Sequence, residues 1–242
     1  MIFNLTFFII LWYDISGTFI KKEGNIMRKT AKKGVSVIIA LIMLLGSLQF
    51  SAAAAVGKDI TASFTDPNFL AAVREITGKP TGPIYSGDVK SIETLSLTGR
   101  MISSLSGIEH FTVLKYLDCA HAQLIKLDVS KNTTLEYLDC GYNYYLTELD
   151  VSKNTALEYL CCYSGQLTEL DVSNNIVLRE LICNYNQLTK LDISYNTALR
   201  YLACDGNQLT KLDVSNNIAL EYLACHDNQL TELDVSKNIA LE

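Results

Sequence analysis

A 21-residue repeat fills the C-terminal half of the sequence and limits what the chain can fold into. The last complete copy, LEYLACHDNQLTELDVSKNIA, starts at Leu220, and LRYLACDGNQLTKLDVSNNIA precedes it. The copies begin at Leu114, Leu135, Leu157, Leu178, Leu199 and Leu220. One step is 22 residues long because of an extra tyrosine in Tyr144-Tyr145. A fixed period of this length predicts a solenoid, in which each repeat forms one turn of a coil.

Each repeat contains two halves with the same pattern. In the copy from Leu178, the order leucine, leucine, cysteine, asparagine returns ten residues later with isoleucine in place of cysteine. We therefore expect a strand-rich right-handed coil with two short parallel strand segments per turn and little helix. The apolar side chains would face inward, where stacked turns bury a core that one turn could not. Asn186 and Asn196 fall at bends, where we expect their side chains to bond the neighbouring turn's backbone.

Charge and motifs argue against two classes of function. The chain has a formal charge of −6, and residues 56–242 hold 14 basic and 24 acidic side chains. Such an acidic chain repels phosphate backbones, so we do not expect nucleic acid as a partner. The sequence contains no H-E-x-x-H, no G-x-S-x-G and no glycine-rich phosphate loop, and its three histidines are scattered. We expect no catalytic residues, no metal and no cofactor.

The first 55 residues have the composition of an export signal with extra residues in front. Met27 opens the basic segment MRKTAKKG, an apolar run over 35–45 follows, and small residues end the stretch. We expect a signal peptide over 27–55 and, over 1–26, a translated leader from a misplaced start. Two membrane segments are the alternative, but the apolar run at 2–13 is too short to span a bilayer. The mature chain is expected to be a secreted or cell-surface monomer without a membrane span.

The segment between the signal and the repeats is expected to cap the solenoid. Asp66-Pro67 and the apolar spacing that follows predict a helix over 67–77 within a cap of residues 56–87. Residues 88–113 form a first, longer-style repeat with the pattern I-x-x-L-x-L-x-x-R. The cysteine-containing repeats occupy 114–242 without a C-terminal cap, so we expect the sequence to be a fragment of a longer chain.

The repeat resembles a known class. The unit L-x-x-L-x-C-x-x-N-x-L-x-x-L-D-V-S-x-N is similar to the cysteine-ladder repeats of internalin-like leucine-rich-repeat surface proteins of Gram-positive bacteria. The segment 105–108, Leu-Ser-Gly-Ile, resembles the L-x-G-I of the internalin repeat. The resemblance implies a secreted or wall-anchored adhesion module that binds a protein or glycoprotein. Two alternatives stay open: a structural spacer that presents a missing domain, and the recognition part of a secreted effector whose enzyme domain is absent.

Six cysteines fall five residues after the first leucine of each repeat and are expected to form a buried column, the cysteine ladder: Cys119, Cys140, Cys162, Cys183, Cys204 and Cys225. Parallel strands lie about 4.8 Å apart, whereas a disulfide needs Cβ atoms near about 3.8 Å. We therefore expect reduced thiols that pack as small hydrophobes, and not disulfides or a chain of zinc ions. Cys161, next to Cys162, should point outward and be the only thiol labelled in the native protein.

Aspartates form a second column, in the second half of each repeat: Asp128, Asp150, Asp171, Asp192, Asp213 and Asp234. Stacked like charges are costly, so something must offset them. We expect each carboxylate to bond the backbone or the serine of the adjacent bend. A row of bound calcium ions is the alternative, which is disfavoured because calcium needs about six to eight oxygen ligands.

Tyrosines form the candidate ligand-binding surface, which we call the tyrosine stripe: Tyr116, Tyr137, Tyr159, Tyr201 and Tyr222. Glu180 interrupts the column, and Tyr185, Asp205 and His226 are expected at its rim. Strand alternation places the stripe on the outer face of the sheet. The tyrosines could serve only sheet stability, or they could bind a protein, since tyrosine offers contact area and a hydroxyl at low entropic cost. The matching column of the second half is charged, and we expect an ordinary solvated face there.

Overall fold

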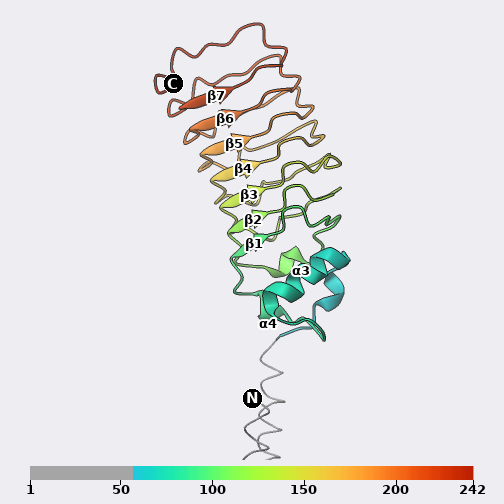
Figure 1. The fold of residues 1–242 in the computed structure, drawn as a ribbon. Helices are drawn as coiled ribbons and strands as arrows, with labels where there is room; N and C mark the ends of the chain where they lie inside the picture. The colour runs from blue at the N-terminus through green and yellow to red at the C-terminus, as the bar shows by residue number, and fades with distance from the viewer. Residues whose placement is uncertain (1–56, 242) are drawn as a thin grey trace, which may run out of the picture. The chain divides into compact units, whose positions relative to one another are not determined.

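The computed structural model describes residues 57–241, and these belong to one compact unit (Figure 1). The leader and signal peptide expected over 1–55 lie outside the described residues. No helix in the described range is long and apolar enough to cross a membrane.

One parallel sheet runs through the repeats. Seven strands of three residues each pair in sequence order: β1 (Thr94–Ser96), β2 (Tyr116–Asp118), β3 (Tyr137–Asp139), β4 (Tyr159–Cys161), β5 (Glu180–Ile182), β6 (Tyr201–Ala203) and β7 (Tyr222–Ala224). The register matches equivalent repeat positions, so Leu138 pairs with Leu160 and Leu160 with Leu181. In Figure 1 the strands form a stack from the N-terminal to the C-terminal repeat. The solenoid predicted from the repeats is confirmed.

The second strand segment expected in each turn does not form in the described residues. Only one isolated bridge, between Asp128 and Asp150, occurs in that half of the repeat. The reason lies in the side chains, which take up backbone groups that a ladder would need. The Asp128 carboxylate accepts from the Ser130 N–H at 2.9 Å, and the Asn154 amide donates to the Val129 carbonyl at 3.0 Å.

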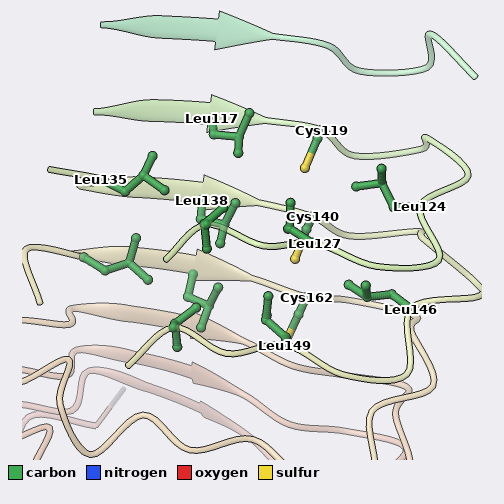
Figure 2. Close-up of a cluster of buried hydrophobic side chains, with 14 of the residues drawn as sticks. Leu117, Cys119, Leu124, Leu127, Leu135, Leu138, Cys140, Leu146, Leu149 and Cys162 are labelled. Atoms are coloured by element: carbon green, nitrogen blue, oxygen red, sulfur yellow. The ribbon is translucent and has the colours of Figure 1, made fainter. Parts of the chain in front are cut away.

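The core is a set of stacked leucine layers (Figure 2). The central leucine of each strand from β1 to β6 is fully buried. The residue two positions later lies on the same inward face, and it is Leu97 after β1 and a ladder cysteine after β2 to β6. Figure 2 shows Leu117 and Cys119 above Leu138 and Cys140. Burial of each leucine side chain stabilises the fold by about 1.5–3 kcal/mol, because its apolar surface is removed from water. Because neighbouring turns provide that burial, stability rises with each added turn.

Two asparagine columns tie the turns together, as the sequence predicts. Asn186 donates to the carbonyl of Cys162 in the preceding turn at 2.9 Å, and its Oδ1 accepts from the Leu167 N–H at 3.0 Å. Asn196 donates to the carbonyls of Val172 and Asn175 at 3.0 and 2.9 Å. These contacts satisfy backbone groups at bends that no strand ladder reaches.

The extra tyrosine of the third repeat is absorbed by a local turn. The Leu146 N–H bonds the Asn143 carbonyl at 2.9 Å, whereas the equivalent Leu124 N–H bonds an asparagine side chain of the next turn. The next turn has Gly165 where that asparagine would stand. The insertion and the missing asparagine therefore compensate each other, because the Leu146 donor already has a partner.

The N-terminal segment folds onto the β1 end of the sheet. It contains η1 (Thr61–Ser63), α3 (Pro67–Thr77) and α4 (Ser86–Val89), and η2 (Ile108–His110) follows β1. The Asp66 carboxylate caps α3 by accepting from the N–H groups of Asn68 and Phe69. Gly78 ends the helix in the left-handed conformation, at φ 65°. The inner face of α3 buries Phe69 against the ring of Phe111, with centroids 6.4 Å apart.

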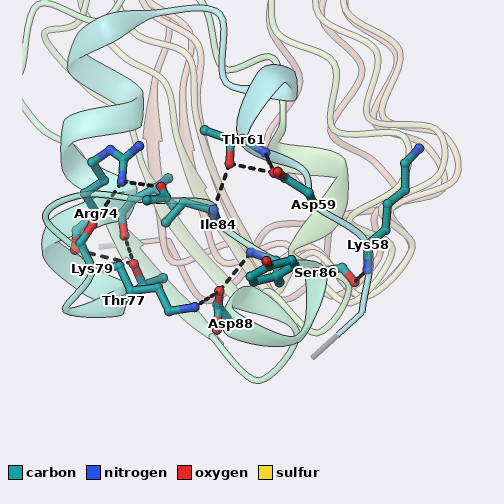
Figure 3. Close-up of polar contacts among 12 residues, drawn as sticks. Lys58, Asp59, Thr61, Arg74, Thr77, Lys79, Ile84, Ser86 and Asp88 are labelled. Atoms are coloured by element: carbon teal, nitrogen blue, oxygen red, sulfur yellow. Dashed lines mark hydrogen bonds and ion pairs between the residues drawn. The ribbon is translucent and has the colours of Figure 1, made fainter. Parts of the chain in front are cut away.

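Polar contacts fix the segments around this helix (Figure 3). The Thr61 hydroxyl donates to the Asp59 carboxylate at 2.7 Å and accepts from the Ile84 N–H at 2.8 Å. Lys79 pairs with Asp88 at 2.5 Å. These bonds hold the loop after α3 against the start of the described chain, so the first turn of the solenoid has a polar cover.

Candidate binding surface

The tyrosine stripe is a stack of rings along the first residues of the strands. The rings of Tyr116 and Tyr137 lie 4.2 Å apart and stacked, as do those of Tyr137 and Tyr159. Tyr201 and Tyr222 form a second stack at 4.3 Å. The strand spacing imposes these distances, because each ring stands above the ring of the adjacent strand.

The stacked rings lie on the outer side of the strands and are partly exposed. Most members are half-buried, and Tyr222 at the last strand is 44% exposed. Burial raises the pKa of the Tyr137, Tyr159 and Tyr201 hydroxyls, so these groups stay neutral in ordinary buffers. The stripe therefore offers a row of neutral hydrogen-bonding groups on a stiff aromatic support.

A second aromatic group lies beyond the strand ends, and Tyr185 is the only one of its members that was predicted from the sequence. His121 stacks on Tyr142 at 4.0 Å, Tyr142 contacts Tyr163 at 4.7 Å, and Tyr163 meets Tyr185 edge-on at 5.3 Å. His121, Tyr142 and Tyr185 have positive φ, between 51° and 57°. Strand alternation does not extend to such residues, so their direction could not be read from a period of two. The signal available in the sequence was an aromatic residue two positions after the ladder cysteine in three turns, whereas Tyr163 comes directly after Cys162.

The rim residues predicted from the sequence come together around one buried carboxylate. Asp205, only 4% exposed, is bonded by the Asn184 amide at 2.5 Å and by the His226 N–H at 2.9 Å. The His226 ring nitrogen Nδ1 lies 2.6 Å from the same carboxylate. Tyr185 lies beside this cluster, because its N–H bonds the Asp205 carbonyl at 2.8 Å. Gly206 is needed there, since a Cβ at that position would stand 2.6 Å from the Tyr185 ring.

Cys161 is not the surface thiol that the sequence suggests. It points to the outer face of β4, but neighbouring side chains cover it and leave it 7% exposed. A Cβ on Gly141 would come within 3.3 Å of its sulfur, so the chain at Gly141 packs closely against this thiol. Burial raises the pKa of Cys161 to about 12, which keeps the thiol protonated and unreactive. The expectation that Cys161 alone is labelled is therefore wrong.

The ladder cysteines are free thiols inside the solenoid. Cys119 and Cys140 each donate weakly to a backbone carbonyl of the next turn, at 3.3 Å. All seven cysteines of the chain are unpaired, and Cys225 in the last turn is the only one that is partly exposed. Burial raises the pKa of the Cys119 and Cys204 thiols, to about 12 for Cys204.

We expect native thiol labelling to modify Cys225 first. The sulfur of Cys225 is partly exposed and can be reached by the reagent, whereas the other six are covered. Mass spectrometry after a short exposure to iodoacetamide would locate the modified residue, and the same reaction in denaturant should modify all seven. Rapid native labelling of Cys183 would contradict the buried ladder.

The opposite half of each turn carries the aspartate column, whose carboxylates act locally. Asp171 accepts from the Ser173 N–H at 2.9 Å, and the other members repeat this contact. The hydrogen bond from Ser173 lowers the pKa of Asp171, so it stays charged. The structural role predicted for these aspartates is confirmed. The predicted solvated face beside them contains shallow hollows, one of which has a volume of about 700 Å³ and is lined by residues that include Glu148, Glu169 and Lys190.

Solved structures share this architecture. The functional domain of InlJ from Listeria monocytogenes, which includes a cysteine ladder, is 32% identical, with a TM-score of 0.50 over 77% of this chain and 51% of that one. A leucine-rich-repeat protein of Leptospira interrogans is 29% identical, with a TM-score of 0.62 over 66% of this chain and 44% of that one. The chain is a leucine-rich-repeat solenoid that is similar to internalins. It spans about half the length of these two structures.

A third structure supports the fold alone. Internalin C2 from Listeria monocytogenes is 21% identical, with a TM-score of 0.60 over 78% of this internalin-like chain and 95% of that protein. No protein-family model matches the chain, and a comparison with curated proteins gave no match. The resemblance drawn from the repeat sequence, including its cysteine ladder, is therefore confirmed by the solved structures.

Proposed function

We propose that this chain is a secreted or cell-surface adhesion module without catalytic activity, and that its tyrosine stripe contacts a protein or glycoprotein ligand. The observation that carries the proposal is the concentration of aromatic side chains on one face of the sheet. The stripe follows the first residues of the strands from Tyr116 to Tyr222, and the second aromatic group follows the strand ends from His121 to Tyr185. Tyrosine is enriched in binding hot spots because it supplies contact area and a hydroxyl with few rotatable bonds.

The rigidity of the surface supports the same proposal. Stacked rings and the Asp205 cluster hold their side chains in place before a ligand arrives, so binding would order few groups. A spacer is the second candidate, and the repeating turns suit it, but a spacer does not require an aromatic face. The experiment below separates the two.

We expect a triple variant, Tyr159→Ala/Tyr201→Ala/Tyr222→Ala, to lose at least about tenfold in adhesion to host cells or mucin, because three anchors of the stripe are removed. The measurement is adhesion of the purified chain, with circular dichroism to verify folding. A Phe triple variant at the same positions keeps the stacks and controls for stability. Lys190→Ala/Lys211→Ala on the opposite face controls for unspecific charge effects. A folded Ala variant that adheres like the parent would favour the spacer.

A further inference from the structure

The tyrosine stripe has a gap at β5. The register places Glu180 between Tyr159 on one side and Tyr201 on the other. Tyr159 stacks on Tyr137, and Tyr201 stacks on Tyr222. Each of the two flanking rings therefore has one stacked face, and its other face is turned toward the position of Glu180. We call this place, bounded by Tyr159, Glu180 and Tyr201, the Glu180 slot.

The slot has the dimensions of a cation site. The two flanking rings are two strand steps apart, roughly 9–10 Å. A cation midway between them lies within the distance of about 6 Å at which an aromatic face attracts it. A tyrosine side chain also reaches farther from the sheet than a glutamate side chain. The outer parts of the rings therefore form the walls, and the carboxylate forms the floor.

The charge of the slot is not neutralised by the chain itself. Glu180 is exposed, and no ion pair within residues 57–241 involves it. The two arginines that precede the β5 and β6 strand positions have other partners. Arg179 pairs with Glu158 at 3.1 Å, and Arg200 pairs with Glu221 at 3.4 Å. A carboxylate between two aromatic faces is thus left for a positive group from outside.

We propose that the Glu180 slot binds the guanidinium group of an arginine side chain presented by the protein ligand. A planar guanidinium can lie between the two rings, within cation–π range of both, while its N–H groups reach the carboxylate. A lysine ammonium cannot do both as well. The inference rests on the proposed function, because it names the kind of partner that the stripe would recognise. It predicts a ligand surface with an exposed arginine at its centre.

The test uses a small probe, so that it does not depend on the natural ligand. N-acetyl-arginine methylamide is titrated into the purified chain, and the tyrosine ring signals are followed by NMR. The signals of Tyr159 and Tyr201 are assigned by their loss in single Phe variants. We expect weak, saturable shifts of these two rings and none for Tyr116. The citrulline analogue, which has the same shape without charge, should give no shift. Equal shifts with citrulline, equal shifts with the lysine analogue, or no saturable shift with arginine would overturn the proposal.

Two substitutions at the gap sharpen the test. Glu180→Tyr should complete the stack without harm to the fold and abolish probe binding, whereas Glu180→Gln should weaken it about threefold to tenfold. Glu169→Gln, on the opposite face, is the matched control and should leave binding unchanged. Glu180→Tyr that binds like the parent would also overturn the slot. If the triple variant loses adhesion but the parent chain does not bind the arginine probe, the slot is refuted and the proposed function stands. If the parent chain binds the probe but the triple variant adheres like the parent, the proposed function is refuted.

Discussion

Replacing Asn196 by aspartate should lower the free energy of unfolding by about 3–5 kcal/mol at neutral pH, because it places an unpaired charge in the core. The Asn196 amide is fully buried and donates to the carbonyls of Val172 and Asn175. Aspartate has the same shape, but it turns an acceptor oxygen toward those two carbonyl oxygens. The amide oxygen already lacks a partner in the described residues, so neither carboxylate oxygen would find a donor.

The loss should depend on pH in a defined direction. Burial without a donor raises the folded-state pKa of the new carboxyl above its unfolded value of about 3.9. The folded state then binds a proton more readily than the unfolded state, so the difference from the parent should shrink as the pH falls through the folded pKa. The variant and the parent are compared at each pH, because both contain the aspartate column. The pKa values of these aspartates are lowered in the folded state, so their protonation in acid destabilises both chains.

Urea unfolding followed by circular dichroism would measure the effect. Asn216→Asp is the matched control, because Asn216 lies in the next turn, is exposed, and bonds only the Ser194 carbonyl at 3.2 Å. We expect the control to change the free energy of unfolding by less than about 0.5 kcal/mol. An Asn196→Asp loss as small as the control's would show that the asparagine column contributes little to stability.

Truncating Leu181 to alanine should cost about 3–5 kcal/mol, because the cavity lies between two filled turns. Leu181 is fully buried in β5, and its register neighbours Leu160 and Leu202 are fully buried as well. Neither strand can move inward without losing its own pairing, so we expect the cavity to persist. Thermal and urea unfolding of the variant would give the difference.

The equivalent substitution at the last strand provides the comparison. Leu223 in β7 is only partly buried, because no further strand in the described residues pairs with β7. Leu223→Ala should therefore cost clearly less than Leu181→Ala. Equal costs at the two positions would contradict a core whose stability is a sum over neighbouring turns.

Asn196→Asp and Leu181→Ala disrupt two different kinds of contact between the turns. The leucine layers bury apolar surface, and the asparagine columns satisfy the bends. Both repeat with the sequence period, so an error at one turn weakens its contacts with two neighbours. The face that carries the tyrosine stripe varies more from turn to turn, and Glu180 is its plainest departure from the repeat.

The repeat pattern is sufficient to predict the solenoid, its inward residues and the roles of its asparagines and aspartates. The physical reason is the fixed period, which assigns each position the same neighbours in every turn, as for Asn196 and Asp171. It also placed the tyrosine stripe on one face, because residues along a strand alternate between two sides.

Where the strand period of two ends, the contacts between side chains depend on the packing of the turns and cannot be predicted from the repeat pattern. The second strand was predicted from the echo within each repeat, but asparagine and aspartate side chains take the backbone groups it would need. Cys161 was predicted to be exposed from its direction, but the direction of a side chain does not reveal what covers it. The aromatic group around Tyr142 depends on positive φ angles, and the Asp205 cluster depends on two turns meeting. Such contacts join residues about 21 positions apart, and only the packing of one turn on the next fixes them.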